Sequence, residues 1–409
     1  ISGGTVRTEG DVAVEARNET VIDGWGASGS VGLAAGLAGA AVVTVTQNTT
    51  EALVANAAIG DDQWRAREVS VIARDRTTVD SRVGSAGLSG GAGVGVAVPV
   101  ISANGSTAAR ISNAQVYAGD GGVRVQAVSD RDLRVAGGSL GAGFGGVAGT
   151  VAIILSGARI EGDTRNELNE RGDVLTALSD LGEGDRLVAD GDGRNVEPVE
   201  GLDASRIREL NDSLRFDAAQ GLTEAVTAST SASVTGSSVV DAAGSVSVTA
   251  DERARARLET AGGAMGFYSF GGTVGVVSLA GRAAAEVGAG AEIRTGHGDI
   301  DIAARVGRLA PSDPAVRAQV EQGGGGFVAL GAAVALTDIA ASAAVEIGAG
   351  ATLQAASGSI AIEAEDGLDA DVYAAGLGVG AVAPGAVVAL VQNAGPVSVA
   401  IGSGATIAR

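Results

Sequence analysis

The sequence predicts an all-β protein: an elongated β-helix built from about six repeats of roughly 57 residues. Three observations predict this fold. A strand-like motif recurs at a nearly constant spacing, Gly contributes 66 of the 409 residues, and the hydrophobic fraction of 45% consists almost entirely of Ala, Val, Leu and Ile. Only 2% of the residues are aromatic. A narrow interior between stacked coils has room for small aliphatic side chains, and glycine suits tight corners.

The recurring motif is a small or acidic residue followed by alternating β-branched residues and Ala, a period-two pattern typical of strands. Subtracting the positions of successive copies gives spacings of 57, 54, 123, 54 and 60 residues. The copies lie at 11–16, 68–73, 122–127, 245–250, 299–304 and 359–364. A second motif, close to Ile-Gly-Ala-Gly-Ala, begins at positions 287, 347 and 401 in the same phase. Two motifs in phase predict a six-fold repeat with about 66 extra residues in the longest interval.

Each repeat shows the same internal order. A strand is followed by a polar segment and a Gly/Ala-rich run such as 84–100, then by a further strand and a polar turn such as 47–50 or 103–106. Since 57 is about three times 19, and coils of about 20 residues are typical of such stacks, we expect three coils per repeat. The alternative is one small β-sandwich per repeat, but sandwiches need about 100 residues.

The extra residues divide the chain into repeats at 1–156, an insertion at 157–222, and further repeats at 223–409. Between 161 and 220 the insertion holds 16 acidic and 7 basic residues, which is −9 of the total charge of −20. Asp173 and Asp203 each precede apolar residues at helical spacing, as helix caps do. We therefore expect a small acidic helical insertion that projects from the stack and provides a binding face.

The insertion also contains the candidate binding residues. Arg171, Gly172 and Asp173 form the tripeptide that integrins recognise, although Asp173 has an alternative role as a helix cap. Clustered carboxylates at 190–195 invite a calcium interpretation, but the spacing departs from the EF-hand pattern and favours an acidic turn. The same interpretation applies to the pair Asp61 and Asp62, and to the group Asp366, Asp369 and Asp371. We predict no metal site and no cofactor.

Composition argues against several functions. The chain has one His, no Cys, and a pI near 4.4 without a basic run, which excludes a Cys-based metal site and argues against nucleic acid as a partner. The carboxylates are dispersed, so we predict no catalytic residues and no enzyme. Trp25 and Trp64 are expected to have packing roles, and His297 is expected in an exposed turn. Apolar runs at 31–45 and 327–336 are shorter than the ~18 residues that a membrane helix needs.

The repeats resemble those of a known family. The run 93–100, the strand at 108–111, residues 123–127 and residues 47–52 are similar to repeats of filamentous-haemagglutinin-like and leukotoxin-family filamentous adhesins. The likeness covers essentially the whole chain except the insertion. It implies a right-handed β-helix that acts as a stalk or adhesin on the bacterial surface, exported by type V secretion through a barrel outside this chain. It implies no catalytic residues. Because Ile1 and Ile401 occupy equivalent repeat positions, we expect an in-phase part of a longer protein.

We therefore predict a secreted or cell-surface adhesion scaffold whose partner is a receptor or glycan on a host or neighbouring cell. We expect no nucleic-acid partner and no membrane insertion of this segment. Two alternatives remain open: a β-helix enzyme that degrades polysaccharides, and a subunit that assembles into filaments or a surface layer.

Overall fold

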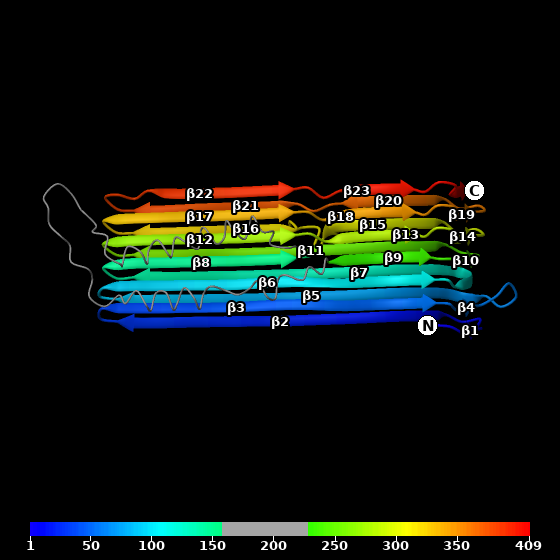
Figure 1. Ribbon diagram of the computed structural model, residues 1–409, viewed down its shortest axis with the longest axis horizontal. Helices are drawn as coiled ribbons and strands as arrows, with labels where there is room; N and C mark the ends of the chain where they lie inside the picture. The colour runs from blue at the N-terminus through cyan, green and yellow to red at the C-terminus, as the bar shows by residue number, and fades with distance from the viewer. Residues whose placement is uncertain (158–227) are drawn as a thin grey trace.

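The computed structural model describes residues 1–157 and 228–409 (Figure 1). Over these residues the protein is all-β, as predicted: it contains strands and no helix. The strands form two sheets, one of ten and one of fourteen strands, and neighbouring strands in both sheets are parallel. The two chain termini lie at opposite ends of the strand stack (Figure 1).

The fourteen-stranded sheet contains β1 (Thr5–Val6), β2 (Val12–Gly32), β4 (Ala58–Ile59), β5 (Ala66–Ser89), β7 (Gln115–Ala142), β10 (Val239–Ala242), β11 (Val246–Met265), β14 (Glu292–Thr295), β15 (Ile300–Arg308), β16 (Val316–Gly325), β19 (Thr352–Ala355), β20 (Ile360–Asp366), β21 (Ala370–Val379) and β24 (Thr406–Ala408). The ten-stranded sheet contains β3 (Ala35–Ala55), β6 (Ala92–Ser112), β8 (Gly145–Ser156), β9 (Ser229–Thr235), β12 (Tyr268–Leu279), β13 (Arg282–Val287), β17 (Val328–Ile339), β18 (Ser342–Ile347), β22 (Gly385–Asn393) and β23 (Val397–Ile401).

Each repeat adds one layer to each sheet. Equivalent positions of successive repeats pair directly, with the spacings predicted from the sequence. In the fourteen-stranded sheet one such ladder runs through Val12, Val69, Val123, Val246, Ile300 and Ile360. The expectation of three coils of about 19 residues per repeat is therefore wrong. Strands of 20 to 28 residues, such as β11, β5 and β7, replace several short ones, and the longest axis runs along the strands, not along the stack (Figure 1).

The chain crosses from the fourteen-stranded to the ten-stranded sheet within the Gly/Ala-rich runs. Gly90 and Gly91 connect β5 to β6, and Gly143 and Phe144 connect β7 to β8. The polar residues 47–50 and 103–106, predicted as turns, instead lie inside β3 and β6. Strand pairing satisfies their backbone, and the Asn48 amide turns inward to donate hydrogen bonds to Thr20 and Thr77, both 3.1 Å long.

The insertion interrupts one strand of the ten-stranded sheet. Strand β8 stops at Ser156 and β9 starts at Ser229, and both pair with the continuous strand β6, on either side of its residues 104–105. Two residues of one repeat are thus replaced by a long segment in the next. The predicted helices of the insertion lie outside the described residues.

The interior between the two sheets combines apolar ladders with a buried polar belt. Small aliphatic ladders were predicted, and fully buried residues such as Val125, Ile302 and Ile111 confirm them. The polar belt was not predicted. Its members are Asn18, Thr20, Asn48, Thr50, Asp75, Thr77, Thr107, Arg131, Thr230 and Glu252. Several of these residues hydrogen-bond to one another: Asp75 accepts a hydrogen bond of 2.6 Å from the Asn18 amide, and Glu252 accepts hydrogen bonds from Arg131 and Thr230. The hydroxyl of Thr50 is buried without a hydrogen-bond partner among the described residues.

Near the reversals, the points where the chain crosses from the fourteen-stranded to the ten-stranded sheet, the two sheets approach each other backbone to backbone. A Cβ at Gly141 would lie 1.8 Å from the carbonyl oxygen of Val147, and one at Gly95 would lie 2.3 Å from that of Leu140. Only glycine permits such an approach. The Gly/Ala-rich runs therefore thin the molecule at this end as well as providing its corners.

Candidate binding surface on the fourteen-stranded sheet

Alternate residues of the long strands in the fourteen-stranded sheet point into the interior and out to solvent. On β7, Arg131, Leu133 and Val135 are buried, while Arg134 on the other side is exposed. We name the outer side the charged face. Its charged residues include Asp80, Arg82, Asp130, Asp132, Arg134, Arg253, Arg255, Arg257, Asp313, Arg317 and Asp371.

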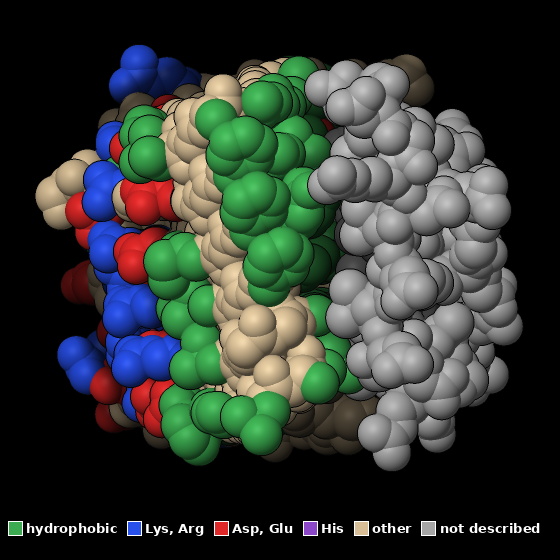
Figure 2. Space-filling model, turned by 90° about the vertical axis from the view of Figure 1, so that its left-hand side faces the viewer, with side chains coloured by type: hydrophobic (Ala, Val, Ile, Leu, Met, Phe, Trp, Pro, Cys, Tyr) green, Lys and Arg blue, Asp and Glu red, His purple; other side chains and the backbone are tan. Residues whose placement is uncertain are grey.

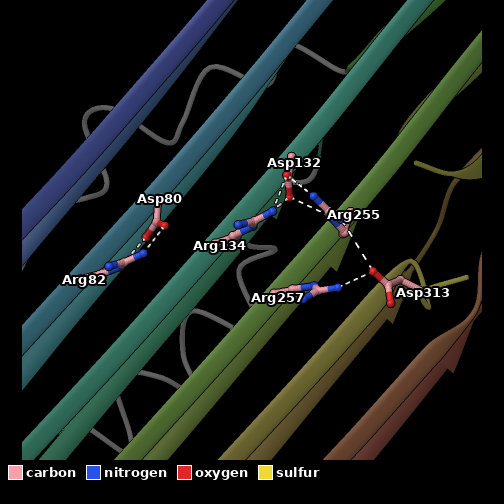
Figure 3. Close-up of polar contacts among 7 residues, drawn as sticks. All are labelled: Asp80, Arg82, Asp132, Arg134, Arg255, Arg257 and Asp313. Atoms are coloured by element: carbon pink, nitrogen blue, oxygen red, sulfur yellow. Dashed lines mark hydrogen bonds and ion pairs between the residues drawn. The ribbon is translucent and has the colours of Figure 1, made fainter. Parts of the chain in front are cut away.

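Ion pairs on the charged face run both along and between strands (Figure 3). Arg82 donates two hydrogen bonds, of 3.0 and 2.7 Å, to Asp80 two residues away on the same strand. Asp132 accepts hydrogen bonds of 3.3 and 2.9 Å from Arg134 on its own strand. It also accepts hydrogen bonds from Arg255 on the adjacent strand β11. The two guanidinium groups therefore share one carboxylate, which bridges two repeats.

A short excursion completes this network. Residues 309–315 separate β15 from β16, whereas β11 in the preceding repeat passes the same point without interruption. The excursion carries Asp313, whose Oδ2 lies 2.5 Å from Nη2 of Arg257 and 3.7 Å from Nη1 of Arg255. The longer repeat thus supplies a counter-charge to two arginines of its neighbour.

Neighbouring carboxylates on β7 differ in acidity. Partial burial alone would raise the pKa of Asp132, but hydrogen bonds from Arg255 and Arg134 outweigh it, and the pKa lies below its ordinary value of 3.8. Asp130 behaves in the opposite way. Burial raises its pKa, and attraction to Arg253 and Arg76 offsets only part of that rise. The pKa of Arg255 is raised, chiefly by its hydrogen bond to Asp132.

An open depression of about 490 Å³ lies beside the ion pairs on the same face. Its floor is formed by small residues, including Gly84, Gly138 and Ala261. The larger side chains that line it are Trp25, Arg82, Glu259, Gln319 and Glu321. A second depression of about 560 Å³ adjoins it, sharing the same floor and adding Leu140.

Most of the acidic residues considered as calcium ligands in the sequence instead accept hydrogen bonds from backbone N–H groups in the described structure. Asp61 accepts hydrogen bonds from the backbone N–H groups of Gln63 and Trp64 and pairs with Arg7 at 3.0 Å, as an acidic turn does. The backbone hydrogen bonds lower its pKa. Asp369 similarly accepts a hydrogen bond of 2.9 Å from the backbone of Ala315.

Asp366 accepts the backbone N–H of Leu368 at 3.1 Å, and Asp371 lies 3.6 Å from Arg317. Within the described ranges, no three His, Asp or Glu side chains are arranged so that they could hold a metal ion. The tripeptide Arg171, Gly172 and Asp173, and the acidic segment 190–195, lie outside the described residues.

The packing roles expected for the tryptophans are wrong. Trp25 is 77% exposed on the charged face, and Trp64 is 50% exposed in the loop between β4 and β5. Both are too wide for the narrow interior and face solvent instead. His297 lies in an exposed bend, as predicted, with Nε2 3.6 Å from the Asp120 carboxylate.

A separate apolar strip follows the reversals. Phe267 stacks against Phe144 and Phe327, with ring centroids 5.3 and 5.0 Å apart. Figure 2 shows hydrophobic side chains gathered along this edge. Because the phenyl faces are stacked on one another, the strip presents mainly ring edges to solvent.

Sequence reasoning missed the depression because its larger side chains come from different repeats. Trp25 stood out in the sequence, but its companions Arg82, Glu259 and Gln319 are ordinary polar residues there. The repeat spacing was the available signal, since it sets which residues share a column across the strands.

Comparisons with protein-family models, with curated proteins and with solved structures gave no match to this chain. The part of the chain that the structure describes contains no helix long and apolar enough to cross a membrane.

Proposed function

We propose that the chain is a right-handed β-solenoid segment of a large bacterial surface protein, located outside the cell, where it acts as a rigid spacer and adhesion scaffold. The observation that carries this proposal is the in-register parallel pairing of equivalent positions through all six repeats. Each repeat pairs its strands only with those of adjacent repeats, so repeats can be added without altering the pairing of those already stacked. The resemblance of the repeats to filamentous adhesins supports the same role.

The distribution of polar groups also supports a spacer. Long parallel strands satisfy the backbone, the polar belt cross-links the interior, and ion pairs such as Asp132 with Arg255 connect adjacent repeats outside. Ion pairs that span repeats resist sliding of one layer over the next, because a shift in register would separate the partners. The proposal assigns recognition of a cell-surface receptor to Arg171, Gly172 and Asp173 in the insertion.

The test compares adhesion by three forms of the protein to receptor-bearing cells and matrix-coated surfaces. The first is the full chain. The second lacks residues 157–228 and joins Ser156 to Ser229 through Asn-Gly, as residues 104–105 do in the preceding repeat. The third carries Asp173→Glu, a conservative change that removes the tripeptide.

We expect the full chain to adhere and the other two to lose receptor-dependent adhesion. A deletion variant with unchanged strand content, measured by circular dichroism, serves as the folding control. Equal receptor-dependent adhesion by all three forms would contradict the role given to the insertion. Absence of adhesion by the full chain to any surface would contradict the adhesive proposal itself.

One observation favours a second candidate, an enzyme that acts on polysaccharides. The depression on the charged face brings Glu259 and Glu321 together with Arg82, and paired carboxylates are the usual machinery of glycoside hydrolysis. Release of reducing ends from a polysaccharide by the purified chain, abolished by Glu259→Gln, would favour this candidate over the structural one.

A further inference from the structure

One column of outward side chains crosses all six repeats on the charged face. We name it the groove column. It runs through Trp25, Arg82, Ala136, Glu259, Gln319 and Tyr373, each paired in register with the next. Strands in a sheet lie about 4.8 Å apart, so the five steps from Trp25 to Tyr373 span about 24 Å. An aromatic ring therefore stands at each end of the column, with three polar side chains and Ala136 between them.

The groove column borders a smooth floor. The next outward column consists of Ala27, Gly84, Gly138, Ala261, Glu321 and Ala375. Four of these residues, from Ala27 to Ala261, line both depressions. On the far side Leu140 provides an apolar border. The result is a shallow channel that runs perpendicular to the strands, with a polar and aromatic side and an apolar side.

The two aromatic rings are available for a ligand. Trp25 is 77% exposed and Tyr373 is 54% exposed, and the ring pairs found in the described structure join only Phe144, Phe267, Tyr268 and Phe327 at the reversals. Exposed aromatic side chains with a polar handle are typical of binding surfaces, because they combine apolar area with hydrogen bonding. Their positions at the ends of one column suit an extended ligand better than a compact one.

The charges along the channel indicate what kind of ligand fits. Asp80 holds the guanidinium of Arg82 through two hydrogen bonds, so that positive charge is already balanced. Glu259 and Glu321 add negative charge, and the amide of Gln319 donates a hydrogen bond of 2.7 Å to Glu321. In a chain of net charge −20, such a channel repels polyanions. Carboxylate, amide and guanidinium groups beside exposed rings match the hydroxyls and apolar ring faces of uncharged sugars.

We propose that this channel binds a linear uncharged glycan that lies across the strands between Trp25 and Tyr373. The inference deepens the proposed adhesive function and rests on it for its setting, since it names a glycan as one of the surface ligands. The residues that the proposal assigns to the channel do not include the tripeptide.

The test measures binding of β-1,4-linked oligomers of glucose and of N-acetylglucosamine, from disaccharide to octasaccharide, by calorimetry. We expect affinity to rise with length until the oligomer spans the channel and then to level off. Trp25→Ala and Tyr373→Ala should each weaken binding of the longest oligomer at least about tenfold, as truncation of an aromatic anchor does. Trp64→Ala is the matched control, because Trp64 is also exposed but lies outside the groove column, in the loop between β4 and β5.

Fluorescence gives an independent readout. The chain has two tryptophans, so Trp64→Phe leaves Trp25 as the sole tryptophan reporter. Addition of a long oligomer should shift its emission, and a heparin fragment of the same length should not. The proposal is overturned if no oligomer binds, if the heparin fragment binds more tightly, or if Trp64→Ala weakens binding as much as Trp25→Ala.

The same variants separate this inference from the proposed function. Glycan binding that persists in the form lacking residues 157–228 supports a site on the charged face, whereas its loss there overturns the channel as the site. If the full chain binds the oligomers through Trp25 but adheres to no cell or matrix, the adhesive proposal fails and the glycan channel stands. If the full chain adheres but binds no oligomer, the channel fails and the adhesive proposal stands.

Discussion

The inner and outer faces of the fourteen-stranded sheet each carry an ion pair between an arginine and a carboxylate, in two different environments. Arg131 and Asp132 are adjacent on β7, yet Arg131 points inward to Glu252 and Asp132 points outward to Arg255. The side chains of the inner pair are 2% and 3% exposed. The side chains of the outer pair, Arg255 and Asp132, are 17% and 11% exposed, and Asp132 also pairs with Arg134. The same strand pairing therefore places both pairs, and the deeper burial of the inner pair makes the loss of one partner more costly there.

The largest expected effect comes from breaking the inner pair while leaving the outer one intact. Arg131→Met leaves the Glu252 carboxylate buried without a cation, which should lower the free energy of unfolding by about 3–5 kcal/mol. Arg255→Met on the outer face should lower it less, by about 1–2 kcal/mol, because Asp132 keeps its hydrogen bonds to Arg134 and is partly reached by water. Urea unfolding of the two variants measures the difference.

The double variant Arg131→Met with Glu252→Leu provides the control. Replacing a whole buried pair by apolar residues is often neutral, so the double variant should recover most of the lost stability. Equal losses for Arg131→Met and Arg255→Met would show that burial does not distinguish the two faces.

A second comparison uses glycines on the two faces of β7. Gly141 faces the other sheet at 1.8 Å from the Val147 carbonyl oxygen, measured from an added Cβ, whereas a Cβ at Gly138 would have its nearest neighbour 4.0 Å away. Gly141→Ala should destabilise the protein by about 2–3 kcal/mol because the two backbones must separate. Gly138→Ala should be neutral within about 0.5 kcal/mol. Thermal unfolding of both variants tests this, and a tolerated Gly141→Ala would show that the sheets can part at this end.

Acid should weaken the outer face through Asp132. Its pKa is lowered in the folded protein, so its stabilising contribution is present above the ordinary carboxyl range and disappears as pH falls through the folded pKa. Asp132→Asn should therefore lose about 0.5–1 kcal/mol at pH 7, after allowance for screening at the surface. The difference from the wild type should vanish well below pH 3.8. A constant difference over the whole range would assign the loss to packing instead.

The smallest expected effect has the opposite sign. The pKa of Asp130 is raised, chiefly by burial, so its ionisation begins to oppose folding as the pH rises above the ordinary pKa of 3.8, and this effect is complete above the folded pKa. Asp130→Asn should stabilise the protein by a few tenths of a kcal/mol at pH 7. Below the ordinary pKa of 3.8 it should have no effect. Destabilisation at pH 7 would show that the attraction of Asp130 to Arg253 outweighs its burial.

The repeat spacing predicted much of the fold, because a one-repeat offset is also the strand register: Val12 with Val69 is a sequence match and a pairing in the sheet. The positions at which the chain turns from one sheet to the other were predicted wrongly. Polarity at 47–50 suggested a turn, yet Asn48 and Thr50 contribute to a buried polar belt that no local pattern reveals. The Gly/Ala-rich runs suggested corners but not the close approach of two sheets, which depends on residues such as Gly141 and Val147 facing each other.

Long-range partners were the least predictable. Arg131 and Glu252 are 121 positions apart and look like ordinary surface charges in the sequence. Trp25 and Tyr373 share a column only because five successive registers connect them. Each register depends on repeat lengths that vary. An excursion such as 309–315 adds residues to one repeat while the strands on either side of it keep their pairing partners.

The one-layer-per-repeat arrangement also has a kinetic consequence. Contacts between equivalent strands join residues at least 52 positions apart, so the first two layers must close a large loop before any pairing forms. Folding should therefore begin with a slow nucleation event and continue faster, as each new repeat adds to an existing template. Closure entropy grows only with the logarithm of loop length, so the 123-residue offset across the insertion adds about 0.7 kcal/mol relative to an ordinary repeat. A long segment can thus be inserted within one layer, between β8 and β9, while the folding kinetics of the whole stack change little.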